Sequence, residues 1–284
     1  MSTPLTNPRR CLLFVPGSRP ERFDKAVATG ADQVCIDLED AVAPADKQTA
    51  RAAVLAYLAD APAGHSEIGL RVNPVSSDLG RADLSALAAS AARPAFVMLP
   101  KVESAAELAA ADALLAGLDT QFIVQIETPK GLLDARQIVA ASTRVQALMF
   151  GGFDYIVALR GRACWESFFH PRVQLATVAA EADVGCMDVP FLDIKDQAGL
   201  VEETERALAL GFTAKAAIHP AQVGPVQNTY LPTEVEYARA RQVVAALAAS
   251  GGEAIALDGK LVDRPIEIAA QRAIALGAHG TRSP

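Results

Sequence analysis

The chain has 284 residues, of which 51% are hydrophobic and only 5% aromatic. That length can form one large domain with a sizeable core, and the abundant alanine favours helices packed closely on a sheet. The net charge of −7 argues against non-specific binding to nucleic acid or to an anionic membrane, although a local basic patch can still hold a phosphate-bearing ligand.

No apolar run reaches the roughly 18–20 residues of a membrane-spanning helix, and residues 1–10 lack the apolar core of a signal peptide. None of the four cysteines forms a CxxC pair. Cys11, Cys35 and Cys186 lie in or beside strand-like runs, where cysteine is usually a small buried hydrophobic residue. We therefore expect a cytoplasmic protein with reduced thiols and no structural zinc, which binds neither nucleic acid nor membranes.

Eight short apolar runs follow one another along the chain, each ending in polar or turn-forming residues. They cover residues 11–17, 32–40, 68–73, 95–101, 122–128, 147–154, 184–191 and 214–220. Their interiors are almost continuously apolar, which is typical of strands buried on both faces of a parallel sheet. Alanine-rich helical stretches separate most of them. We predict an α/β fold, a (β/α)8 TIM barrel, which eight units before residue 220 favour over a doubly wound open sheet.

The chain continues past the eighth unit, so we expect a catalytic barrel domain over residues 1–230 and a C-terminal helical extension over residues 231–284. Thr233 is expected to cap the first helix of the extension, with Glu236 completing a capping box and Gly251 ending the helix.

Residues 253–278 are predicted to form a short extended segment, a turn at Asp258 and Gly259, and a last helix starting at Pro265. Asp263 would lie near the N-terminal end of this helix, where free backbone N–H groups can hold a carboxylate. The segment is too short to fold alone, so we expect it to pack on the barrel or on a neighbouring subunit.

The active site of a (β/α)8 barrel lies at the carboxyl ends of its strands. In this sequence those ends carry a biased set of polar residues: Asp37, Glu39, Asp40, Arg71, Asn73, Lys101, Glu127, Asp154 and His219. Charges at the ends of apolar strands are costly to desolvate unless they are paired or bound to a metal. They therefore mark the candidate site.

Glu127 and Asp154 end consecutive predicted strands and should lie on one side of the barrel mouth. Two carboxylates without histidine or cysteine beside them suit a hard cation such as Mg²⁺, which often takes only one or two protein carboxylates. The alternative is that Arg71 or Lys101 neutralises each carboxylate and no metal binds.

Arg71 is the best candidate to hold a substrate carboxylate, because its planar fork matches that group. It could also be a structural partner of the acidic cluster at 37–40. Gly151 and Gly152 would let the backbone approach a ligand closely. His219 could act as an acid or base, but a role in fixing a turn is favoured.

The strongest motifs occur in one order along the chain: LLFVPGSRPERFDKA, DQVCIDLEDAV, LRVN, LPKVES, IETPKG, FGGFD, AKAAIHPAQV and LDGKLVDRPIEIAAQRA. Together they resemble the citrate lyase β-subunit-like group of the HpcH/HpaI aldolase superfamily, which includes malyl-CoA and citramalyl-CoA lyases. The resemblance covers nearly the whole chain. It is much more specific for the family than for the substrate.

The resemblance implies a role for each matching residue. Glu127 and Asp154 would bind Mg²⁺, and Glu127, Gly151 and Gly152 would lie against the substrate. Arg71 would contact the oxo-acid and the nascent enolate, while Glu39 and Asp40 would hold metal-bound waters and nearby basic groups.

The resemblance also implies a coenzyme A thioester and an oligomer. The thioester would be bound at the end of the first strand by Pro16, Gly17, Arg19 and Lys25, although Arg22 and Lys25 could instead be solvated residues of the first helix. Asp263 would reach the site of a neighbouring subunit as general acid/base, with Asp258 a weaker candidate. Relatives suggest a homotrimer.

Three departures from the family pattern bear on the substrate. Phe153 stands where many relatives have glutamate. The segment 164–183 is divergent: where many relatives have a small-residue, arginine-bearing stretch, this chain reads HPRVQLATVAAEADVG. Leu261 replaces a common methionine. The first two fall near the expected acyl and thioester pocket, whereas the metal pair is intact.

The leading hypothesis is therefore a Mg²⁺-dependent carbon–carbon lyase that cleaves or forms a β-hydroxyacyl-CoA, yielding an oxo-acid and an acyl-CoA. Arg71 would stabilise the enolate and Asp263 would protonate its carbon. One alternative is the β subunit of a citrate lyase whose thioester sits on an acyl carrier protein. Another is a metal- or coenzyme A-binding regulatory module without turnover.

Overall fold

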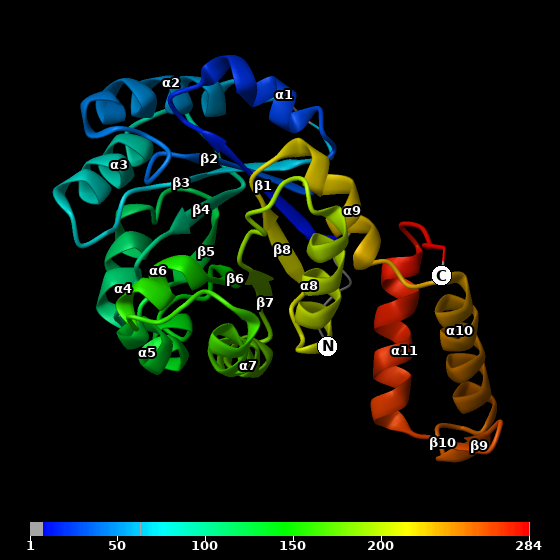
Figure 1. Cartoon of the computed structure of the whole chain (residues 1–284). Coiled ribbons are helices and arrows are strands. Elements are labelled where there is room, and N and C mark those ends of the chain that lie inside the picture. The colour runs from blue at the N-terminus through cyan, green and yellow to red at the C-terminus, as the bar shows by residue number, and fades with distance from the viewer. Residues whose placement is uncertain (1–7, 63, 284) are drawn as a thin grey trace.

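The computed structural model describes residues 8–62 and 64–283 and contains a closed barrel of eight parallel strands (Figure 1). The strands in chain order are β1 Cys11–Pro16, β2 Gln33–Asp37, β3 Glu67–Arg71, β4 Phe96–Leu99, β5 Gln121–Ile126, β6 Val145–Phe150, β7 Gly185–Asp188 and β8 Ala214–Ala217. Each strand pairs with the next, and β1 closes the barrel by pairing with β8. The predicted barrel is confirmed, and the open sheet is excluded.

Helices surround the strands as expected for this architecture. They are α1 Phe23–Val27, α2 Lys47–Ala59, α3 Asp78–Ala88, α4 Ala105–Leu114, α5 Pro129–Val139, α6 Gly152–Ala158, α7 Trp165–Glu181, α8 Gln197–Ala209 and α9 Val223–Thr229. Short 3₁₀ turns, η1 Pro20–Arg22, η2 Pro44–Asp46 and η3 Pro220–Gln222, lie at three strand-to-helix connections. Among the described residues, no helix is long and apolar enough to cross a membrane.

Apolar side chains fill two layers of the barrel. One layer lies inside the strands and includes Leu12, Met98 and Ile123, while the larger layer lies between strands and helices. Both faces of each strand are thus buried, which explains the continuous apolar runs in the sequence. Charged side chains within the strands are therefore buried and need a partner, as Lys215 of β8 has in Asp188.

The sixth strand ends earlier than the sequence suggested. The strand was expected over 147–154, but β6 stops at Phe150 and Asp154 lies in the first turn of α6. Gly152 begins this helix directly after the strand, with Gly151 as its N-cap. Because the chain enters a helix here, Asp154 lies over the barrel mouth and does not continue the strand.

The C-terminal residues form an arm, which we define as α10 Glu234–Ala249, β9 Ile255–Leu257, β10 Lys260–Val262 and α11 Arg264–Gly277. Thr233 and Glu236 form the predicted capping box. Asp258 and Gly259 both have positive φ and connect β9 to β10. Two paired strands thus replace the single extended segment that we expected.

The arm stands clear of the barrel, with β9 and β10 at its far end (Figure 1). Its own small core includes Val243, Leu247 and Val262. At its base, the Arg282 guanidinium pairs with Glu205 of α8 at 2.9 Å. Of the two packing partners that we expected for the tail, its own barrel does not cover the outer part of the arm, and packing on a neighbouring subunit stays a prediction.

Candidate active site

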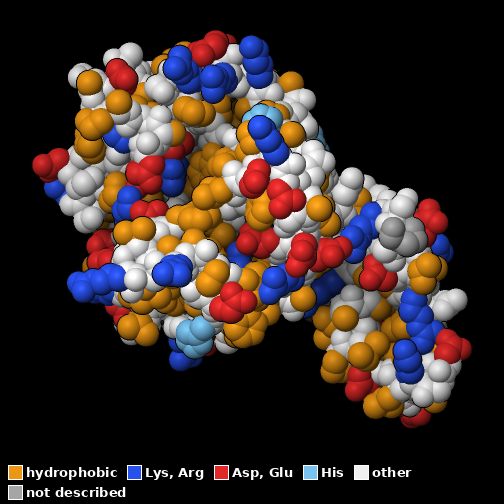
Figure 2. Space-filling model, viewed as in Figure 1, with side chains coloured by type: hydrophobic (Ala, Val, Ile, Leu, Met, Phe, Trp, Pro, Cys, Tyr) orange, Lys and Arg blue, Asp and Glu red, His pale blue; other side chains and the backbone are white. Residues whose placement is uncertain are grey.

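A pocket of about 360 Å³ opens at the carboxyl ends of the strands. Its lining residues are Phe14, Val15, Pro16, Asp37, Asp40, Ala41, Arg71, Gln125, Met149, Gly151, Phe153, Asp154, Val189, Pro190 and Ile218. Figure 2 shows a hollow in the barrel face, with hydrophobic side chains in its depth and charged side chains beside it. The pocket thus lies where (β/α)8 barrels place their active sites.

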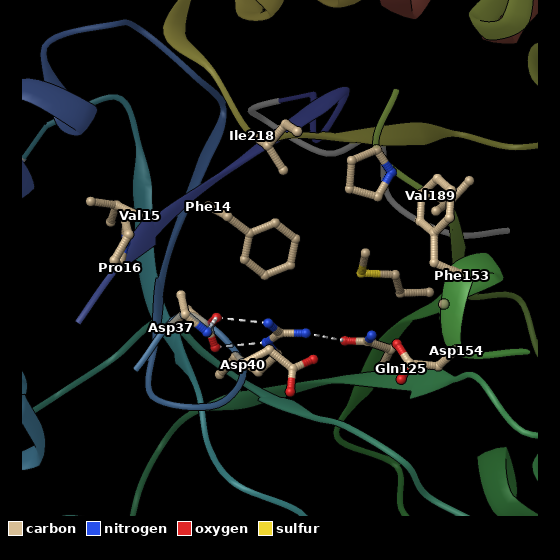
Figure 3. Close-up of a pocket in the computed structure, with 15 residues that line it drawn as sticks. Phe14, Val15, Pro16, Asp37, Asp40, Gln125, Phe153, Asp154, Val189 and Ile218 are labelled. Atoms are coloured by element: carbon tan, nitrogen blue, oxygen red, sulfur yellow. Dashed lines mark hydrogen bonds and ion pairs between the residues drawn. The ribbon is translucent and has the colours of Figure 1, made fainter. Parts of the chain in front are cut away.

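Arg71 is held in one orientation by the end of β2. Its Nε and Nη2 donate to the two carboxylate oxygens of Asp37, each at 2.7 Å, and its guanidinium lies 5.0 Å from the Phe14 ring centroid. Its Nη1 faces Gln125 Oε1 at 3.4 Å (Figure 3). The alternative role as partner of the acidic cluster is therefore present. Nη1, which also lies 3.0 Å from Glu39 Oε2, is the nitrogen of the fork that Asp37 leaves for a substrate carboxylate.

Lys101 lies among three carboxylates. Its Nζ donates to Glu39 Oε1 at 2.7 Å and lies 3.7 Å from Asp40 and 4.0 Å from Asp154. Its backbone has a φ of 53°, an uncommon conformation for a non-glycine residue, and its amide N–H donates to Glu127 Oε1 at 2.8 Å. One residue thereby fixes the positions of several acidic groups.

Glu39 has one buried oxygen that lacks a hydrogen bond. Arg71 Nη1 lies 3.0 Å from Glu39 Oε2, but the contact does not have hydrogen-bond geometry, so no donor serves this atom within the described structure. Burial raises the pKa of Glu39 above its ordinary value, although the Arg71 charge and the Lys101 hydrogen bond oppose this. A buried carboxylate oxygen without a hydrogen-bond donor is a suitable acceptor for a water molecule bound to a nearby cation.

Glu127 is a buried carboxylate, only 1% exposed, that directly follows β5. Its Oε2 accepts a hydrogen bond from Gln125 Nε2 at 2.6 Å, and its only other donor among the described residues is the Lys101 amide. Burial, followed by the charges of Glu39 and Asp154, raises the pKa of Glu127 to about 8. The ion-pair alternative therefore fails for Glu127, since no cationic side chain of the described chain pairs with it.

Because Gly151 has no side chain, the space directly beside Glu127 stays open. A Cβ atom at this position would lie 2.3 Å from Glu127 Cβ and 2.6 Å from its Oε2. Asp154, in the next turn, has a half-exposed carboxylate whose nearest cation is Lys101 at 4.0 Å. The buried, unneutralised Glu127 and the exposed Asp154 fit a hard divalent cation that keeps water in its other positions. Within the described residues, no cluster of three or more metal-ligating side chains occurs.

The end of β1 forms another edge of the pocket. Pro16 lines the pocket, and the Gly17 amide donates to the Asp37 carbonyl at 2.8 Å. A Cβ at Gly17 would lie 2.7 Å from that carbonyl oxygen, so glycine permits this close approach. Arg19 and Lys25 are exposed on the following turn and helix. Figure 2 shows basic side chains gathered over this corner of the barrel.

None of the three predicted acid/base candidates, Asp263, Asp258 and His219, lines the pocket of its own chain. Asp263 follows β10, which Figure 1 places at the far end of the arm. It occupies the N-cap of α11, but its side chain makes no capping hydrogen bond, so the expectation that helix N–H groups hold it is wrong. Asp258 is paired with Arg239 of α10. His219 Nδ1 accepts from the Ala221 amide at 3.2 Å, which is the favoured turn-fixing role.

Sequence reasoning missed two kinds of site residue. Gln125 connects Arg71 with Glu127, and a polar residue two positions before Glu127 in an apolar strand was a signal for it. Phe14 and Met149 were missed because nothing in the sequence distinguishes them from ordinary barrel core.

A closed parallel barrel with a carboxylate-rich pocket at the carboxyl ends of its strands defines the class of (β/α)8-barrel enzymes. Residues 10–220 match the family described as HpcH/HpaI aldolase/citrate lyase. The chain belongs to this family, which confirms the resemblance seen in its motifs.

Individual relatives share nearly the whole chain. The L-malyl-CoA/beta-methylmalyl-CoA lyase of Cereibacter sphaeroides is 33% identical, with 92% of each chain covered. The mitochondrial citramalyl-CoA lyase of Homo sapiens is 30% identical, with 95% of this chain and 85% of the human protein covered. The structure of protein CitE from Mycobacterium tuberculosis in complex with magnesium, acetoacetate and coenzyme A has a TM-score of 0.81 and 34% identity, covering 97% of this chain and 100% of that one.

Proposed function

We propose that this protein is a Mg²⁺-dependent carbon–carbon lyase that cleaves or forms a β-hydroxyacyl-CoA such as malyl-CoA or citramalyl-CoA. The observation that carries this proposal is the buried carboxylate of Glu127, which has no cationic partner in the described structure. It lies against Gln125 and Gly151, which line the pocket together with Asp154 and Arg71. The names of the malyl-CoA and citramalyl-CoA relatives support the reaction class.

Glu127 and Asp154 would hold the cation. Glu39 and Asp40, which are held by Lys101, would accept hydrogen bonds from the water ligands of the cation. When bound, Mg²⁺ would supply Lewis-acid stabilisation to the substrate hydroxyl as that hydroxyl loses its proton. The magnesium in the Mycobacterium tuberculosis CitE complex supports this choice of metal.

The side chains of this protein would stabilise and orient the other charges. Arg71, fixed by Asp37 and packed against Phe14, directs Nη1 toward Gln125 and into the mouth. There it would bind the oxo-acid carboxylate and the enolate oxygen that forms as the carbon–carbon bond breaks. Its pKa is raised because its contacts with Asp37 and Glu39 outweigh burial, so the positive charge persists throughout the reaction.

The thioester would enter along the end of β1. Pro16 lines the pocket wall, and Gly17 keeps the turn tight against β2. Arg19 and Lys25 are exposed beyond this turn, where they could meet coenzyme A phosphates. Coenzyme A in the CitE complex supports this part of the proposal.

We further propose a homo-oligomer, with a trimer as the expected form, in which Asp263 of one chain protonates the enolate carbon in the pocket of another. The support is geometric, because the arm carries Asp263 away from its own barrel (Figure 1). A general acid at this position would complete a pocket whose other carboxylates serve Arg71, Lys101 or the cation.

The direct test incubates purified protein and Mg²⁺ with malyl-CoA or citramalyl-CoA and measures release of glyoxylate or pyruvate. We expect turnover that disappears with EDTA and returns with added Mg²⁺. Turnover only with a thioester attached to an acyl carrier protein would favour the citrate lyase subunit. Saturable coenzyme A binding without turnover of any of these thioesters would contradict the lyase and favour a regulatory module.

A further inference from the structure

The pocket is divided into two chemically different halves by the strands that supply it. The ionic half comes from β2, β3, β5 and the start of α6, with Asp37, Arg71, Gln125 and Asp154 at its surface. The apolar half comes from β1 and from the ends of β6 to β8 and includes Phe14, Met149, Val189, Pro190 and Ile218. Figure 3 shows Phe14, Ile218 and Val189 facing the row of Asp37, Asp40 and Gln125.

Phe153 extends the apolar half to the edge of the cation site. It precedes Asp154 in α6, lines the pocket, and packs edge-on against Phe168 at a centroid distance of 6.0 Å. Phe168 in turn packs against Phe150 of β6 at 5.6 Å. The Phe153 ring is therefore supported from behind and forms a fixed apolar surface beside the expected metal.

Val189 and Ile218, on the other side of the apolar half, are also held in place by hydrogen bonds of their backbone. The carbonyl of Val189 accepts a hydrogen bond from the buried Lys215 Nζ at 2.8 Å, and the Ile218 amide donates to Gln222 Oε1 at 2.9 Å. Ile218 is nevertheless 42% exposed at the rim of the pocket. An apolar side chain held rigidly at the edge of an ionic site is stabilised when a ligand covers it with hydrocarbon.

We propose that the apolar half binds an alkyl substituent of the substrate, with Phe153 and Ile218 as specificity-determining residues. This inference rests on the proposed lyase function, and it predicts that reactants with longer alkyl chains bind better than glyoxylate and acetyl-CoA. The alkyl group belongs either to the 2-oxo acid or to the acyl group of the thioester. In both reactants the alkyl group lies next to a charged or polar reacting group, so the pocket alone does not tell them apart. Two series of ligands, one of oxo-acids and one of thioesters, distinguish them.

The test measures binding, so it does not depend on turnover. Calorimetry with Mg²⁺ present would compare glyoxylate, pyruvate, 2-oxobutyrate and 2-oxovalerate, and then acetyl-, propionyl- and butyryl-CoA. We expect affinity to rise roughly fourfold per added methylene in one series, the magnitude expected for burial of a methylene. A rise in the first series assigns the group to the oxo-acid and a rise in the second to the thioester. Flat or falling affinity in both series would overturn the proposal.

Variants then test the named residues. Phe153→Ser and Ile218→Ser should reduce the affinity ratio between the longest and shortest members of the rising series, whereas Phe153→Leu should retain it. Leu133→Ser, at a 76% exposed residue of α5 outside the pocket, is the matched control. Ile218 lies at the rim, so its variant should fold even if Phe153→Ser does not. Equal losses for every ligand, with the ratio unchanged, would show that these residues do not select the alkyl group.

The binding experiment tests the alkyl-group assignment separately from the lyase proposal. If no thioester is turned over but affinity still rises with chain length, the apolar half has its assigned role in a protein that binds without reacting. If turnover occurs but both affinity series are flat, the lyase proposal survives and the alkyl assignment is wrong.

Discussion

Gln125 organises the ionic half of the pocket by holding two opposite charges at once. Its Oε1 accepts from Arg71 at 3.4 Å, and its Nε2 donates to Glu127 at 2.6 Å. The uncharged amide thus keeps the guanidinium from neutralising Glu127 directly. This spacing leaves the Glu127 carboxylate available to a cation that is not a protein side chain.

Glu127→Gln should abolish the rise in melting temperature that Mg²⁺ produces in the unmodified protein. The substitution replaces a buried carboxyl group, which must lose its proton to bind a cation, by a neutral amide of nearly the same shape, so the cation loses its most desolvated ligand. Thermal unfolding with and without MgCl₂ would measure the effect. Glu253→Gln, at an exposed residue outside the pocket, is the control and should respond like the unmodified protein. An unchanged Mg²⁺ response in Glu127→Gln would remove Glu127 from the metal site.

Arg71→Lys should lose roughly two or more orders of magnitude in kcat/KM while the protein remains folded. Lysine keeps the charge but cannot form the two parallel bonds to Asp37 and still reach Gln125. Steady-state kinetics and a thermal melt measured together would separate the two effects. A kcat/KM close to that of the unmodified enzyme, in a folded variant, would show that Arg71 has only a structural role.

At the scale of elements, the strands could be predicted because burial on both faces leaves a continuous apolar signature. The caps of the arm were equally readable, since Thr233 and Glu236 form a local pattern that needs no tertiary partner. The end of β6 was not, because Gly151 and Gly152 fit either an extended end or a helix start. Only the packed structure shows that Asp154 belongs to the helix.

The same physical reasoning explains which half of the pocket could be predicted. Charged residues at strand ends, such as Arg71 and Glu127, stand out because burial of an unpaired charge is costly. Phe14 and Met149 do not stand out, since apolar residues that face a ligand and apolar residues that fill the barrel have the same sequence pattern. Their role follows from the open space beside them.

The connection between β7 and β8 depends on a buried ionic network beneath the pocket. Lys215 Nζ donates to Asp188 at 2.7 Å, Val189 O at 2.8 Å and Glu203 at 2.7 Å, and Arg172 pairs with Asp188 at 2.8 Å. Burial alone would raise the pKa of Asp188, but the charges of Lys215 and Arg172 lower it below its ordinary value. The network therefore keeps Asp188 ionised.

Lys215→Met should lower the free energy of unfolding by about 3–5 kcal/mol, because it leaves buried acidic groups and the Val189 carbonyl without their donor. Urea denaturation would measure the loss. Arg136→Met is the matched control: it removes an ion pair whose side chains are 75% and 50% exposed, and it should cost about 1 kcal/mol or less. Equal small losses in both variants would contradict a stabilising role for the network.

At the scale of the whole molecule, the arm exposes apolar side chains that its own barrel does not cover. Leu261 is 69% exposed, Val235 73%, Ile266 44% and Ile268 38%. Leu261, Ile266 and Ile268 flank Asp263 in sequence, so the carboxylate is surrounded by surface suited to a protein partner. A second copy of the chain would supply both a cover for this surface and a pocket for Asp263.

Asp263→Asn should lower kcat by roughly two or more orders of magnitude, the scale of a lost general acid/base, while Mg²⁺ and oxo-acid binding persist. If Asp263 acts on a neighbouring chain, mixing Asp263→Asn with Arg71→Ala protein should restore part of the activity. Some mixed pockets would then combine a native Arg71 with a native Asp263 from the other chain. Subunit exchange must first be verified by native mass spectrometry of differently tagged chains. Absence of rescue after verified exchange would contradict action between subunits, because every mixed oligomer with the proposed arrangement contains such pockets.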